Sequence, residues 1–247
     1  MMKKLYEKSE LWFALVWIVA YVVLVSAGDN LSDAAGIMKL ITLPILILLS
    51  AILLIFLKKN QLLEKYGLCM SQLPASKMLF YIPLMILLTA NLWYGVALNV
   101  SVTETVLYIL SMLCVGFLEE VIFRGLLFNA MAEDGVRAAV IVSSVTFGIG
   151  HIVNLFNGSG ADLVSNMLQV VYAVAVGFAF VMIYLRTKSL LICIAVHGVF
   201  NSLSIFSDTA AITPEREIIS GILIAIIAGA YALYIVLKVK EKEHTPH

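Results

Sequence analysis

Residues 104–130 read ETVLYILSMLCVGFLEEVIFRGLLFNA, an apolar stretch that carries two glutamates and an arginine in its second half. About 20 apolar residues cross the hydrocarbon core of a bilayer as an α-helix, so this longer stretch tilts or extends beyond the hydrocarbon. Its charged residues Glu119, Glu120 and Arg124 would each cost about 2.5–3.5 kcal/mol at mid-bilayer, and such charges usually face the bundle interior and mark function. The stretch therefore predicts a membrane helix that carries a polar site.

The composition of the whole chain agrees with a membrane protein. Its 247 residues are 62% hydrophobic and 13% charged, whereas a soluble domain has about 45–50% apolar and 25% charged residues. Too little polar surface would remain to cover a water-facing globule. We therefore expect a single integral membrane domain over residues 1–247, surrounded by the lipid bilayer. The formal net charge of zero gives no sign of a nucleic-acid partner, and we expect none.

Apolar runs near 20 residues recur along the chain and predict an all-α polytopic membrane bundle of about eight transmembrane helices. The expected spans cover residues 11–28, 38–57, 78–98, 104–130, 137–156, 163–185, 189–206 and 218–238. The first run ends in the residues VSA at 25–27, which loosely resemble a signal-peptidase site. Because the run is long enough to span, we expect an uncleaved first helix.

Lysine and arginine set the expected orientation of these helices. The N-terminal segment, every second connection and the C-terminal segment hold nearly all of them. The remaining connections hold only Arg216, with Lys39 at the mouth of the second span. The alternation predicts a multi-pass protein of the cell membrane with both termini in the cytoplasm.

The three charged residues of the fourth span fall into two groups by their spacing. Glu120 and Arg124 are four residues apart, so they share a helical face and can form an ion pair. Glu119 points about 100° away from Glu120 and is left without a local cation, which suits a general base. The alternative is a purely structural ion pair that locks helices together, with the second glutamate protonated.

Two histidines lie in other spans. His151 ends the motif FGIGH at residues 147–151 in the fifth span, and His197 begins HGVFN at 197–201 in the seventh. A lone histidine in a membrane helix is often an interhelical hydrogen-bond donor. However, Glu119, His151 and Asn201 each lie about 16–21 Å from the cytoplasmic end of their own helix, with His197 about one turn shallower. This agreement in depth predicts one polar site.

These motifs together resemble the CAAX protease and bacteriocin-processing family of intramembrane endopeptidases, relatives of the type II CAAX prenyl protease. The family pattern is Glu-Glu-x-x-x-Arg, then Phe-x-x-x-His, then His-x-x-x-Asn or Asp, on separate membrane helices. Here it runs from Glu119 to Arg124, from Phe147 to His151, and from His197 to Asn201. The resemblance covers a core of roughly residues 104–206.

The resemblance implies an enzyme, an intramembrane protease that hydrolyses a membrane-embedded or membrane-tethered peptide. The substrate class stays open between prenylated CAAX-type and leader or bacteriocin-type peptides. Glu119 with His151 would activate a water, and His197 with Asn201 would hold the oxyanion. The supporting residues would be Glu120, Arg124 and Phe147.

The cofactor and two other functions stay open at this point. Zinc is possible, and its ligands would be Glu119, His151 and His197. We expect no required metal, because Asn201 beside His197 suits an oxyanion donor better than a zinc shell. A family member without catalysis, acting in bacteriocin immunity or regulation, is one alternative. A proton-coupled transporter is another, although the sequence has no inverted repeat.

Overall fold

The computed structural model describes residues 2–156 and 162–239, and in these two ranges every regular element is helical. The α-helices are α1 (Met2–Lys8), α2 (Glu10–Ala34), α3 (Thr42–Lys59), α4 (Ile82–Leu88), α5 (Val102–Glu119), α6 (Phe128–Ala132), α7 (Val136–Gly150), α8 (Leu163–Thr187), α9 (Leu191–Leu203) and α10 (Pro214–Lys238). Tighter or wider helical turns are η1 (Ala75–Tyr81), η2 (Ala90–Leu92), η3 (Glu120–Leu127), η4 (His151–Leu155), η5 (Ser204–Phe206) and η6 (Thr209–Ala211).

The number of membrane-crossing segments agrees with the prediction from hydropathy. In the described part of the chain, 7 helical stretches are long and apolar enough to cross a membrane, and Leu191–Phe206 forms a shorter apolar helix. Together they coincide with the eight expected spans. The all-α membrane bundle is therefore confirmed.

The third span differs from the continuous crossing expected over residues 78–98. Leu79, Phe80 and Tyr81 adopt left-handed backbone angles, with φ of 51°, 51° and 58°, so the chain makes a left-handed turn before α4. Pro83 lies in the first turn of α4, where its missing N–H costs nothing. Regular helix ends at Leu92. Hydropathy detects such a segment but does not report these breaks.

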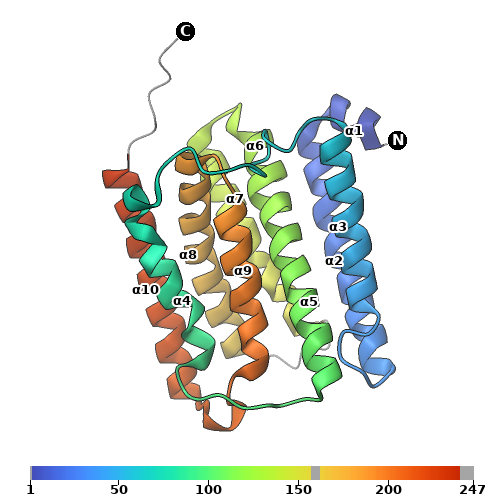
Figure 1. The fold of residues 1–247 in the computed structure, drawn as a ribbon, viewed down its shortest axis with the longest axis vertical. Coiled ribbons are helices and arrows are strands. Elements are labelled where there is room, and N and C mark those ends of the chain that lie inside the picture. The colour runs from blue at the N-terminus through green and yellow to red at the C-terminus, as the bar shows by residue number, and fades with distance from the viewer. Residues whose placement is uncertain (1, 157–161, 240–247) are drawn as a thin grey trace.

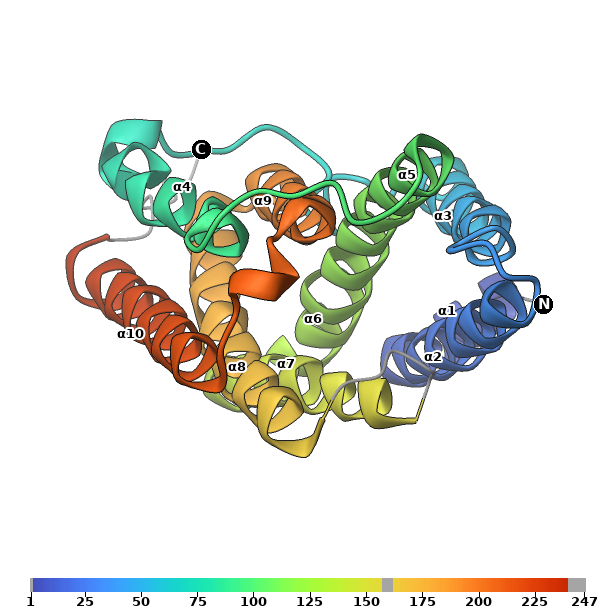
Figure 2. The same ribbon diagram turned by 90° about the horizontal axis from the view of Figure 1, so that it is seen from below.

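The helices run roughly antiparallel and form one bundle (Figure 1). Seen along the bundle, α2 and α3 form one side, α4 and α10 form the opposite side, and α5 to α9 lie between them (Figure 2). α1 and the last turn of α10 lie at the same end (Figure 1). The connections that hold most of the lysines and arginines lie at that end as well.

Glycines allow the central helices to approach one another closely. A Cβ placed on Gly116 of α5 would lie 2.5 Å from the backbone nitrogen of Gly198 on α9. A Cβ on Gly148 of α7 would lie 2.3 Å from a side-chain carbon of Val174 on α8. The two glycine contacts bring α5 against α9 and α7 against α8.

Candidate active site

The charged triplet lies where the fourth span changes its helical winding. Glu119 is the last residue of α5, and η3, which begins at Glu120, is a π-helix. At its end the Phe128 N–H donates to the Phe123 carbonyl, five residues back instead of four. Short π-helical segments inside α-helices occur frequently at functional sites. The winding therefore changes within the motif itself.

Glu120 is the centre of a fully buried ion-pair network. Its Oε1 accepts from Arg124 Nη1 at 3.1 Å, and both side chains are 0% exposed. The same oxygen lies 2.8 Å from His197 Nδ1. The pairing of Glu120 with Arg124 expected from their spacing is thus present, and it also holds a histidine on α9. Because a carboxylate only accepts, Nδ1 of His197 carries the hydrogen in this contact.

Aromatic packing surrounds the guanidinium of Arg124. Its central carbon lies 3.9 Å from the centre of the Phe147 ring, a cation–π contact. Gly177 on α8 provides the space, because a Cβ there would lie 3.2 Å from Arg124 Nη2. These contacts fix the cation that holds Glu120.

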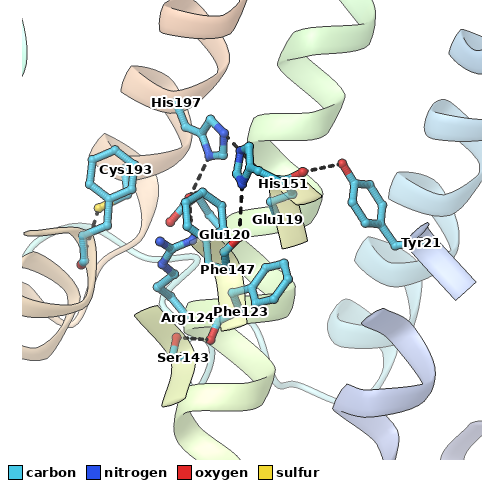
Figure 3. A network of polar contacts seen from close by, with 11 residues as sticks. Tyr21, Glu119, Glu120, Phe123, Arg124, Ser143, Phe147, His151, Cys193 and His197 are labelled. Carbon is cyan, nitrogen blue, oxygen red and sulfur yellow. Dashed lines mark hydrogen bonds and ion pairs between the residues drawn. The ribbon is translucent and has the colours of Figure 1, made fainter. Parts of the chain in front are cut away.

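Glu119 faces away from Arg124 and meets two other groups (Figure 3). Its Oε1 accepts a hydrogen bond of 2.6 Å from the Tyr21 hydroxyl on α2. Its Oε2 lies 3.6 Å from His197 Nε2, longer than a direct hydrogen bond. The side chain of Glu119 is 15% exposed, against 0% for Glu120. Of the two neighbouring carboxylates, only Glu119 is accessible.

Phe147 lies between the two histidines. Its ring is edge-on to His151 at 5.2 Å and to His197 at 5.6 Å between ring centres. The Phe147 carbonyl lies 3.1 Å from His151 Nδ1. A carbonyl only accepts, so Nδ1 carries the hydrogen and Nε2 of a neutral His151 is left as an acceptor.

A cavity of about 60 Å³ adjoins both histidines. Its polar lining consists of His151, His197, Asn201, Gln169 and Tyr172, and the rest of the lining is apolar. His197 borders this cavity and also faces Glu119. It therefore links the carboxylate to a space that can hold part of a ligand.

The structure brings the residues singled out from the sequence into one region. Glu119, Glu120, Arg124, Phe147, His151 and His197 are joined by direct contacts or ring packing, and Asn201 shares the cavity of the two histidines. The sequence reasoning missed Tyr21. Its signal was weak: Tyr21 is one of several buried residues of α2, with Phe13, Trp17 and Ser32 among them, and their spacing does not point to Glu119.

The zinc triad considered from the sequence would consist of Glu119, His151 and His197. Within residues 2–156 and 162–239, no three His, Cys, Asp or Glu side chains are grouped so that they could hold a metal ion. Nδ1 of His197 is directed to Glu120, and Nδ1 of His151 to a carbonyl, so Nε2 of each histidine stays available, as it also is in metal-ligating histidines. We derive no step through a metal.

The fold and site together define a multi-helix membrane protein with a carboxylate–histidine cluster inside its bundle. The family model described as Type II CAAX prenyl endopeptidase Rce1-like matches residues 100–203. A Bacillus subtilis (strain 168) protein named "Putative membrane peptidase YdiL" is 30% identical over 135 residues, which are 54% of this chain and 50% of that relative. No solved structure gives a significant match.

These matches confirm the resemblance to the CAAX protease and bacteriocin-processing family that the motifs predict. The matched segment contains Glu119, His151, His197 and Asn201. The chain spans about half the length of the curated relative. Tyr21 lies outside the segment that the family model covers.

Proposed function

We propose that this protein is an intramembrane endopeptidase that hydrolyses a membrane-embedded or membrane-tethered peptide with a water activated by Glu119. The observation that carries the proposal is the geometry around His197. Nδ1 is held by the buried Glu120 at 2.8 Å, and Nε2 faces the accessible Glu119 at 3.6 Å. His197 Nε2 is thereby directed to the space beside Glu119 Oε2, where we place the attacking water and the oxygen of the scissile carbonyl.

In the proposed reaction Glu119 acts as the general base. It takes a proton from the water while the water oxygen bonds to the scissile carbonyl carbon, and Nε2 of His151 accepts the second hydrogen bond of that water. The tetrahedral intermediate then breaks its C–N bond, and the proton held by Glu119 passes to the leaving amine. One water is consumed and two peptide ends are formed.

His197 and Asn201 stabilise the negative charge on the carbonyl oxygen of the intermediate. For this role His197 carries hydrogens on both ring nitrogens, and the flanking carboxylates of Glu119 and Glu120 balance its charge. The Asn201 amide donates from the same cavity. Preplaced donors in a dry site are effective because they need no reorganisation as the charge develops.

The experiment compares three variants on a fluorogenic peptide, with and without a prenyl group, in proteoliposomes. Glu119→Gln and His151→Ala are expected to lower kcat by about 100- to 10,000-fold, the usual size of a lost acid–base group. Glu133→Gln, at an exposed glutamate beyond the same span, is the matched control and is expected to keep full activity. Full cleavage by both site variants would overturn Glu119 and His151 as catalytic residues, and absence of cleavage by the unmodified protein would favour a binding or immunity role.

The same assay addresses the metal. We propose that hydrolysis needs no metal, so activity is expected to survive treatment with a strong chelator. Loss on chelation with recovery on adding zinc would contradict this part of the proposal and leave the site residues to be reassigned.

We also propose that the lysine- and arginine-rich end of the bundle faces the cytoplasm of a cell membrane, which would place both termini there. The asymmetry of basic residues between the two ends supports this orientation.

A further inference from the structure

The structure assigns Tyr21 as a positioning residue for Glu119, an inference that rests on the proposed function. Tyr21 is 7% exposed and lies on α2, which packs against η3. It belongs to a buried stripe in which Phe13 and Trp17 precede it at intervals of one helical turn. Of these three side chains, Tyr21 is the one whose polar atom bonds to Glu119.

The hydrogen bond from the Tyr21 hydroxyl to Glu119 has the length of a charge-assisted hydrogen bond. Its oxygen–oxygen distance is 2.6 Å, within the range of O–H bonds to an ionised carboxylate, which are about twice as strong as neutral ones. It occupies Oε1, so the other oxygen is the one that faces His197. The hydroxyl thereby fixes the rotation of the carboxylate and leaves Oε2 directed at the reacting water.

Burial of a tyrosine hydroxyl alone does not make it functional, because buried tyrosines usually find a partner. Tyr231 provides the comparison. It is 2% exposed, and its hydroxyl donates to the Met78 carbonyl at 2.7 Å, away from the site. The two tyrosines match in burial and bond length and differ in whether the acceptor is the proposed base.

Through Tyr21, the N-terminal helix α2 contributes to the surroundings of the proposed base. The other face of α2 is apolar and open to lipid, with Val19 62% and Val23 58% exposed. Tyr21 stands between this face and the carboxylate. A helix outside the family segment thus completes the surroundings of the base.

The test compares Tyr21→Phe with Tyr231→Phe in the full-length protein, with rates expressed per folded molecule. Tyr21→Phe is expected to lower kcat by about ten-fold or more, the order of magnitude of a hydrogen bond to a charged group, with KM unchanged. Tyr231→Phe is expected to keep kcat and to lose only thermal stability. Tyr21→Leu provides a second variant without the hydroxyl and is expected to show the same loss in kcat.

The controls separate this inference from the proposed function. In a Glu119→Gln background, Tyr21→Phe is expected to have no further effect, because the base is already absent. Wild-type kcat in Tyr21→Phe, together with an inactive Glu119→Gln, would overturn the positioning role and leave the peptidase intact. An active Glu119→Gln would overturn the role of Glu119 as general base, on which this inference rests.

Discussion

Two of the ion pairs in the described part of the chain, Glu120–Arg124 and Asp29–Lys39, differ in their surroundings. Glu120 and Arg124 are 0% exposed, and the contact continues to His197 on another helix. Asp29 and Lys39 are 15% and 17% exposed, 2.7 Å apart, and lie at the turn between α2 and α3. Both pairs take charges out of water, but only the first leads into a cluster of titratable groups.

The second pair is satisfied locally. The Thr42 hydroxyl donates to the same Asp29 oxygen at 2.6 Å, and Ser32 accepts from the backbone N–H groups of Ile41 and Thr42. Lys39 is the lysine that departs from the alternation of basic residues along the sequence. Its charge is therefore paired locally, with Asp29. The difference is that the first pair reaches a histidine that faces a second carboxylate, whereas Asp29 contacts Lys39 and the Thr42 hydroxyl of the neighbouring helix.

The largest expected effect comes from removing the cation of the first pair. Arg124→Met would remove the arginine partner of the buried Glu120, and breaking a buried ion pair typically costs about 3–5 kcal/mol. We expect a large fall in unfolding free energy and loss of hydrolysis, measured by denaturant unfolding in detergent micelles and by the peptide assay. Replacing Glu120 as well, in Glu120→Gln/Arg124→Met, should recover stability but not activity. If Arg124→Met were stable and active, the Glu120–Arg124 pair would matter no more to the site than the Asp29–Lys39 pair.

The next effect concerns the distance between the helices that the first pair joins. In Gly116→Ala the new methyl would meet the backbone of Gly198 at 2.5–2.7 Å, so α9 must move and take His197 away from both glutamates. Such overpacking costs about 1–3 kcal/mol, and we expect activity to fall by more than about ten-fold. Gly229→Ala on α10 is the matched control, since nothing lies within 4 Å of the new methyl. Equal behaviour of the two variants would show that α9 tolerates displacement.

The sequence predicted the parts of this arrangement that follow from periodicity and spacing. Hydropathy located the spans because lipid requires long apolar helices, and the interval of four residues predicted the pairing of Glu120 with Arg124. Motif spacing singled out His151 and His197 as residues of one site. These are properties of single helices, and they are local in the chain.

The contacts between helices could not be predicted from periodicity or spacing. Which helix covers Glu119 depends on packing, so the bond from Tyr21, 98 residues away, left no pattern in the sequence. The contact of His197 with Glu120 depends on the close approach of α5 and α9 at their glycines. The left-handed turn before α4 and the π-helical winding of η3 are likewise invisible to hydropathy, because they leave the composition of the span unchanged.

The smallest effect is expected at the second pair, Asp29 and Lys39. It tests whether this pair is independent of Glu119. Asp29→Asn keeps the shape of the side chain and a bond to Thr42 while removing the charge that Lys39 meets, so we expect a loss of about 1 kcal/mol in unfolding free energy and unchanged kcat and KM. Asp29 lies on the same helix as Tyr21, so the assay also reports whether its contacts with Lys39 and Thr42 set the position of α2. A fall in kcat comparable with that of Tyr21→Phe, at unchanged KM, would show that the second pair acts on Glu119 through α2. In that case the two ion pairs would be parts of one arrangement, with Tyr21 as the connection between them.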